Sequence, residues 1–177
     1  DATLTKIPLR TIMDVTAPEH YGDLGFDTAV SGPVKVDWGG SAKDIASTVE
    51  ADGNLTFAPT GVKRKGALSN VPVTGKALAH YTGRNETVLI QQITLPMPQT
   101  NFEASGVLGV NAGDPLTALR VDLTVRDLSE FDQLLTTLDL EGNGKRGAAA
   151  IPLVLHGAVQ FNGTAHGAIA DLDVKGH

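Results

Sequence analysis

Apolar and polar residues alternate along much of this chain, and the alternation narrows the possible folds. The clearest run is at residues 119–125, where Leu119, Val121, Leu123 and Val125 are separated by charged or hydroxyl side chains. Successive side chains of a β-strand point to opposite faces, so such a run gives a strand with one aliphatic face. Two further runs have this pattern: Val34, Val36 and Trp38, and Leu153, Leu155, Val159 and Phe161. The pattern predicts an all-β fold.

Short turn signals separate the alternating runs. They are Asp52-Gly53-Asn54, Thr82-Gly83, Asn143-Gly144 and Asn162-Gly163. Such pairs favour tight turns that join neighbouring antiparallel strands. We therefore expect an antiparallel meander, in which each strand pairs with the next one along the chain.

Two segments have helical spacing instead, so we expect one or two short helices. At residues 128–138, apolar residues recur every three or four positions, and Asp127 with Glu130 can cap the first turn. Near the start, Leu9, Ile12 and Met13 follow Pro8, a residue favoured in the first turn of a helix.

The composition argues against several classes of function. The 14 Lys and Arg residues against 20 Asp and Glu give a net charge of -6, without a basic cluster, so nucleic acid is a poor partner. The longest apolar stretches are far shorter than the roughly 20 residues of a membrane helix. Cysteine is absent, which excludes disulfides and thiolate sites.

No motif in the chain indicates catalysis or cofactor binding. The Ser-Gly pairs lack the nucleophile elbow of hydrolases, and no glycine-rich phosphate loop is present. The five histidines are scattered without metal-ligand spacing. We therefore predict no catalytic residue, no metal site and no cofactor, and we expect that the protein is not an enzyme.

Internal similarity suggests a repetitive architecture. Trp38, Tyr81 and Phe161 each end an alternating run and each precede a glycine by two positions. A second echo has an offset of 119 residues and aligns Leu9 with Leu128. We interpret residues 1–177 as a single β-rich segment of a longer repetitive protein, because repeats need neighbours to cover their ends.

The apolar phase of the strands contains several small residues. Gly32, Gly75 and Gly157 lie among the valines and leucines of this phase, as do Ala77 and Ala79. Small residues let a sheet bend and leave open space. We therefore expect the meander to curl into an open, taco-like apolar trough. The alternative is a compact β-sandwich with a closed core that serves as a binding or adhesion module.

Most of the chain resembles the TamB-like (translocation and assembly module) and AsmA-like bacterial envelope proteins. The resemblance rests on amphipathic strands punctuated by glycine, at residues 21–38, 71–75, 81–85, 100–109, 127–131 and 151–157. It implies a long sheet folded into an apolar trough that carries phospholipids between the inner and outer membranes and supports outer-membrane biogenesis. It also implies an outer-membrane barrel protein as a partner, neighbouring repeats of the same chain, and a location in the periplasm. The inner-membrane anchor of the family has no counterpart in these residues.

The candidate lipid-facing residues are the aliphatic and aromatic members of the alternating runs. They are Val34, Val36, Trp38, Leu119, Val121, Leu123, Val125, Leu153, Leu155, Val159 and Phe161. Each CH₂ group removed from water contributes roughly 0.8 kcal/mol, so a continuous surface of this kind can hold phospholipid acyl chains.

Overall fold

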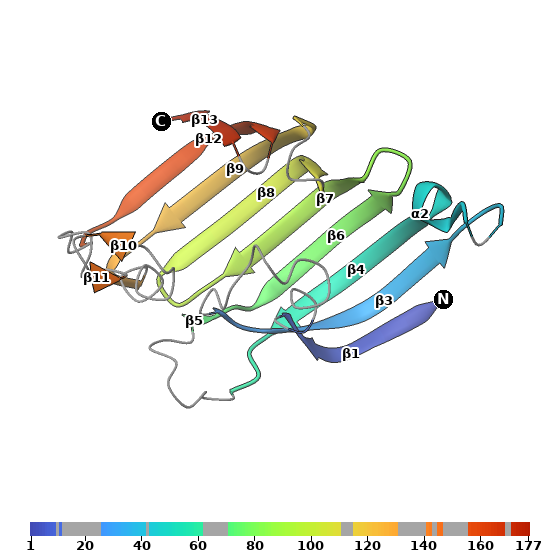
Figure 1. Ribbon diagram of the computed structural model, residues 1–177. Helices are drawn as coiled ribbons and strands as arrows, with labels where there is room; N and C mark the ends of the chain where they lie inside the picture. The colour runs from blue at the N-terminus through green and yellow to red at the C-terminus, as the bar shows by residue number, and fades with distance from the viewer. Residues whose placement is uncertain are drawn as a thin grey trace.

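The computed structural model describes residues 1–9, 11, 26–41, 43–61, 71–110, 115–130, 141–142, 145–146, 156–168 and 171–177, and these are the described residues below. They form an all-β structure with one short helix, which confirms the prediction of an all-β fold (Figure 1). None of the described helices is long and apolar enough to cross a membrane.

Nine strands form one antiparallel sheet in the order β1-β3-β4-β6-β7-β8-β9-β12-β13. Their bounds are β1 Ala2–Pro8, β3 Ala29–Asp37, β4 Glu50–Ala58, β6 Gly75–Thr82, β7 Thr87–Pro96, β8 Thr100–Gly109, β9 Thr117–Val125, β12 Val159–Ala168 and β13 Asp171–Gly176. Each of these strands pairs with the next one along the chain, so the predicted meander is confirmed. The sheet ends at β1 and β13, and it is neither closed nor strongly curled (Figure 1).

The remaining elements are small. β2 (Phe26–Asp27) and β5 (Val71–Pro72) form a parallel pair, and β10 (Glu141–Gly142) and β11 (Lys145–Arg146) form an antiparallel pair. The helix α2 (Ile45–Thr48) connects β3 with β4. It was not predicted, because four residues are too few to show helical periodicity.

The start of the predicted helix at residues 128–138 is described. Asp127 caps it, since its Oδ1 accepts a hydrogen bond from the Ser129 N–H at 3.0 Å. Glu130 does not complete a capping box, because its Oε1 accepts a hydrogen bond from the Gln99 N–H at 3.1 Å. Residues 131–138 lie outside the described residues, as do residues 12–15 of the other predicted helix.

The predicted turns have mixed outcomes. Thr82-Gly83 does end β6 and begin a turn, whereas Asn143-Gly144 lies outside the described residues. The turns at Gly53 and Gly163 are wrong, because these residues lie inside β4 and β12. Each is paired with a neighbouring strand on both sides. Ladder pairing on two sides therefore overrides the local turn preference at both positions.

The predicted strand through residues 153–161 is also corrected. β12 begins only at Val159, and Gly157, with φ of +91°, lies in the irregular segment before it. Leu153 and Leu155 lie outside the described residues. Phe161 is therefore near the start of its strand, whereas Tyr81 is near the end of β6. The aromatic alignment consequently fails at its third copy.

The two segments aligned by the offset of 119 residues differ in their hydrogen bonds. The Leu9 N–H donates to the Thr28 carbonyl at 3.0 Å and directly continues the β1–β3 ladder, in which Pro8 pairs with Ala29. The Leu128 N–H donates to the Gly157 carbonyl at 2.9 Å, beyond the end of β9 at Val125 and outside the β9–β12 register. The two contacts are therefore not equivalent.

Candidate functional site

Cross-strand pairing shows which residues share a face of the large sheet, because paired residues of an antiparallel ladder project to the same side. One row of paired residues crosses all nine strands and contains only aliphatic residues and glycine. From β1 to β13 it is Ala2, Val34, Gly53, Ala79, Ile90, Gly106, Leu119, Ala165 and Val174. We call the side of the sheet that holds this row the apolar face.

The other side holds the charged residues, and we call it the charged face. Apart from Lys6 in the irregular part of β1, every charged residue and histidine of the nine strands lies at a position on this face. They are Lys35, Asp37, Glu50, Asp52, Lys76, His80, Glu103, Arg120, Asp122, His166, Asp171, Asp173 and Lys175. The segregation of charge between the two faces is therefore complete in eight of the nine strands.

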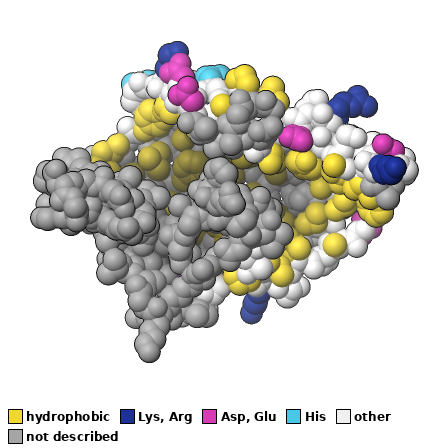
Figure 2. Space-filling model, viewed as in Figure 1, with side chains coloured by type: hydrophobic (Ala, Val, Ile, Leu, Met, Phe, Trp, Pro, Cys, Tyr) yellow, Lys and Arg dark blue, Asp and Glu magenta, His cyan; other side chains and the backbone are white. Residues whose placement is uncertain are grey.

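The apolar face is large. Nine strands at a spacing of about 4.8 Å span roughly 38 Å across the sheet. Figure 2 shows hydrophobic side chains gathered over the middle of the sheet on the side turned to the viewer, with charged side chains mostly around the outline. The face thus exceeds the size of a scattered group of surface hydrophobic residues.

A β-bulge keeps the apolar face continuous across β7. Ile90 pairs with Gly106 and Ile93 pairs with Ala104, so two residues of β7, Gln91 and Gln92, lie opposite one residue of β8. Both glutamines are exposed. The extra residue explains why Ile90 and Ile93 share a face although they are three positions apart.

The structure brings most of the predicted lipid-facing residues together. Leu119, Val121, Leu123 and Val125 of β9 lie beside β12, where Leu123 pairs with Phe161 and Val125 with Val159. Between β9 and β12 in the sequence, the only strands of the described residues are the short β10 and β11. β9 and β12 are therefore neighbours in the sheet although they are far apart in the sequence.

Val34 and Val36 lie on the same face, near the opposite edge of the sheet, and four strands separate β3 from β9. Trp38 follows the end of β3 and is 62% exposed. For Leu153 and Leu155 the prediction lies outside the described residues.

Burial of the apolar face is uneven. Val30 and Val125 are the large side chains that are almost fully buried, at 2% and 1% exposure. Most other large residues of the face, including Val34, Leu119 and Val121, are half-buried. Val159 and Val174 are 39% and 57% exposed. The large side chains of the face are therefore partly accessible to solvent, and the most exposed ones lie in β12 and β13.

Sequence reasoning missed several members of the apolar face. They include Leu4, Ile7, Val30, Leu55, Phe57, Val88, Ile90, Ile93, Leu95, Phe102, Leu108, Leu172 and Val174. The alternation of Leu55 and Phe57 with polar neighbours was a usable signal, but the glycine turn signal at Gly53 obscured it. In β7 the bulge interrupts the period of two, so no alternation template fits the whole strand.

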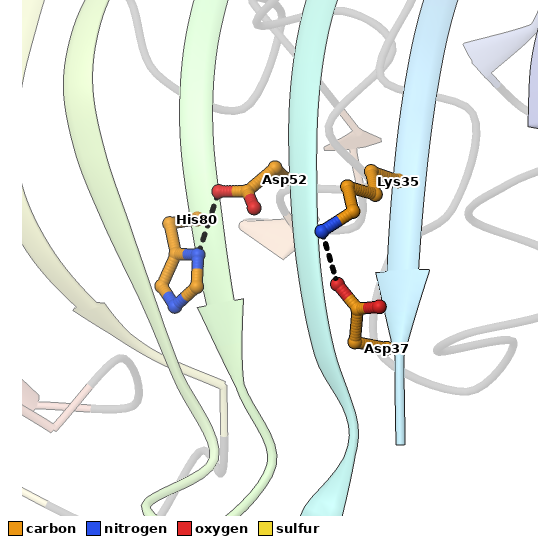
Figure 3. Close-up of polar contacts among 4 residues, drawn as sticks. All are labelled: Lys35, Asp37, Asp52 and His80. Carbon is orange, nitrogen blue, oxygen red and sulfur yellow. Dashed lines mark hydrogen bonds and ion pairs between the residues drawn. The ribbon is translucent and has the colours of Figure 1, made fainter. Parts of the chain in front are cut away.

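The charged face carries ion pairs between side chains of the described strands. The Nδ1 atom of His80 lies 2.7 Å from the Asp52 carboxylate on the neighbouring strand, and Lys35 Nζ lies 2.7 Å from Asp37 (Figure 3). The hydrogen bond and charge of Asp37 raise the pKa of Lys35. Within the described ranges, no three residues among His, Asp and Glu are grouped so that they could hold a metal ion. The His80–Asp52 contact joins β6 with β4, and the Lys35–Asp37 contact lies along β3.

Comparison of the chain with protein-family models, with curated proteins and with solved structures finds no match. The likeness to TamB-like and AsmA-like proteins therefore rests on the sequence pattern alone.

Proposed function

We propose that this chain is a non-enzymatic lipid-binding segment of a protein that bridges the inner and outer membranes. Its apolar face forms the wall of an open trough, deepened by further curling of the sheet, that holds phospholipid acyl chains in the periplasm. An inner-membrane anchor, an outer-membrane barrel partner and neighbouring repeats belong to the same proposal through the resemblance to TamB-like and AsmA-like proteins. The segment would support outer-membrane biogenesis.

One observation carries the proposal, which is the segregation of apolar and charged residues across the nine strands. A sheet face that is partly accessible and carries no charged side chain is costly in water, and it gains free energy when apolar groups cover it. Acyl chains contribute roughly 0.8 kcal/mol for each CH₂ group that leaves water.

The chemistry of the face suits transfer more than tight binding. Apart from Tyr81 and a few threonines, its described side chains are aliphatic, aromatic or absent, as in glycine. Contacts of this type have no preferred direction, so a lipid can move along the face without breaking a specific hydrogen bond at each step.

Val121→Asp tests the proposal directly, because Val121 lies on the apolar face between Ala104 and Gly163. We expect uptake of a fluorescent acyl probe to weaken at least tenfold, since a carboxylate against an acyl chain costs more than about 1.4 kcal/mol. Thr124→Asp is the matched control, because it adds the same charge to the charged face of the same strand. Circular dichroism reports whether each variant is folded.

Native mass spectrometry of the purified protein provides the second readout. The proposal predicts co-purifying phospholipid in the unmodified chain and in Thr124→Asp. If the apolar face is instead the closed core of a β-sandwich, no lipid is carried and Val121→Asp unfolds the protein. Should Val121→Asp fail to fold while lipid still co-purifies with the unmodified chain, Val34→Asp on β3 repeats the test with Lys35→Asp as its control.

A further inference from the structure

The two edges of the large sheet differ in how open they are to another strand. β1 has an irregular register between Leu4 and Ile7, with φ of +51° at Lys6, and it ends at Pro8. Bulges and proline are common features that prevent edge pairing, and β1 has both.

β13 has neither a bulge nor a proline, since its register to β12 is regular over all six residues, and it is exposed along its whole length. Its charged residues, Asp171, Asp173 and Lys175, restrict pairing to a strand that places opposite charges against them. In the described sheet of the 177-residue chain, β13 is therefore the more open edge.

The hydrogen bonds at the end of β13 identify its free main-chain groups. Asn162 and His177 exchange two hydrogen bonds, N–H to carbonyl, of 3.0 and 3.1 Å. Bonded and non-bonded pairs alternate along an antiparallel ladder, so Asp171, Asp173 and Lys175 also bond to β12. The N–H and carbonyl groups of Leu172, Val174 and Gly176 consequently point away from the sheet.

We propose that β13 pairs antiparallel with β13 of a second copy of this chain, with Val174 opposite Val174. This register places Asp173 opposite Lys175 of the other copy, and Asp171 opposite His177, and the two-fold symmetry repeats each pair. The outward groups belong to every second residue, so the two adjacent registers that keep these hydrogen bonds shift one strand by two residues. One of them places Asp173 opposite Asp173, and the other places Lys175 opposite Lys175. Charge complementarity therefore selects a single register.

The paired sheets share one apolar face. The two-fold axis runs perpendicular to the sheet, so the apolar faces of the two copies lie on the same side and join through Leu172 and Val174, which are 40% and 57% exposed. A six-residue strand buries little surface, so the dimer forms only at high concentration. Pairing through β13 uses the main chain of this strand in the 177-residue chain and does not depend on lipid binding. A neighbouring repeat that followed His177 would pair with the same edge in place of the second copy.

Sedimentation equilibrium of the 177-residue chain at concentrations up to about 0.5 mM tests the proposal. We expect a monomer–dimer equilibrium that stops at the dimer. Val174→Pro removes an outward N–H without touching the ladder to β12, so it abolishes the dimer, whereas Val174→Thr retains the N–H and the dimer. A monomer at every concentration would overturn the proposal, and so would a mass that keeps rising, which would indicate pairing of β13 with β1.

Disulfide trapping checks the register, because the chain has no cysteine of its own. The Cα atoms of a bonded pair are about 5.5 Å apart, within the range that a disulfide spans, so Val174→Cys gives a covalent dimer on oxidation. Leu172→Cys is the matched control on the same strand. The two copies of that position lie roughly 14 Å apart in the proposed register, too far for a disulfide. Equal trapping of both variants would contradict the register.

Discussion

Three glycines of the apolar face occupy backbone conformations that other residues rarely adopt. Gly32, Gly75 and Gly106 have φ of +140°, +139° and +125°. A Cβ atom at any of them would overlap a carbonyl oxygen of the neighbouring strand. The backbone conformation therefore requires glycine at these positions, and glycine also adds no side-chain volume to the apolar face.

Gly75→Ala should destabilise the protein by about 1–3 kcal/mol, because the added methyl group meets the Thr94 carbonyl and the φ angle is strained. Gly53→Ala is the control on the adjacent strand. Its Cβ would have its nearest contact, with Leu55 Cγ, at an ordinary 3.5 Å. We expect Gly53→Ala to be neutral or slightly stabilising, since it lowers the entropy of the unfolded chain. Urea unfolding measures both, and equal effects would refute the account of these glycines.

At the scale of elements, local patterns predict some strands and miss others for identifiable reasons. Strict alternation predicts β9, in which aliphatic and polar residues alternate from Leu119 to Val125. The pattern fails at β7, where the bulge at Gln91 and Gln92 changes the period. It also fails at Gly53 and Gly163, where pairing on both sides decides the conformation and local preference does not.

The apolar face was predictable in part from the sequence. Alternation identifies which residues of one strand share a face, so the six described positions predicted in β3 and β9, from Val34 to Val125, lie together on the apolar face. It cannot show which strands are neighbours, because pairing depends on contacts between distant residues. The adjacency of β9 and β12, and the nine-strand row, therefore emerge only from the structure.

The Asp27 side chain connects β2 with the residues that follow β4. Its Oδ1 accepts hydrogen bonds from the Thr60 N–H at 3.0 Å and the Thr60 hydroxyl at 2.5 Å, and its Oδ2 accepts one from the Gly61 N–H at 2.9 Å. Burial acts to raise the pKa of Asp27, but these hydrogen bonds outweigh it and hold the pKa below its usual value. The carboxylate form is therefore favoured in the folded protein.

This contact makes a pH-dependent contribution to stability. Because the folded pKa is lowered, the contribution is complete above the ordinary pKa of 3.8 and is lost as the pH falls through the folded value. Asp27→Asn should lower the stability by about 1 kcal/mol at neutral pH and flatten the decline below about pH 4. Thermal unfolding across the acidic range measures both, and an unchanged acid decline in the variant would show that Asp27 does not contribute.

At the scale of the whole molecule, the described residues form one large sheet rather than two facing sheets of similar size. One side carries charge and the other carries none, apart from the irregular part of β1. An amphipathic single sheet needs an apolar partner for its uncharged side. In our account that partner is the acyl region of phospholipids.

Photo-crosslinking with a phospholipid that carries a diazirine on its acyl chain tests this account most directly. The labelled residues are located by mass spectrometry of peptides. We expect labels on the apolar face, at positions such as Val34, Leu119 and Val121, and few on the alternating positions Lys35 and Arg120 of the same strands. Labels spread equally over both faces, or no label above that of a soluble control protein, would contradict a lipid-binding apolar face.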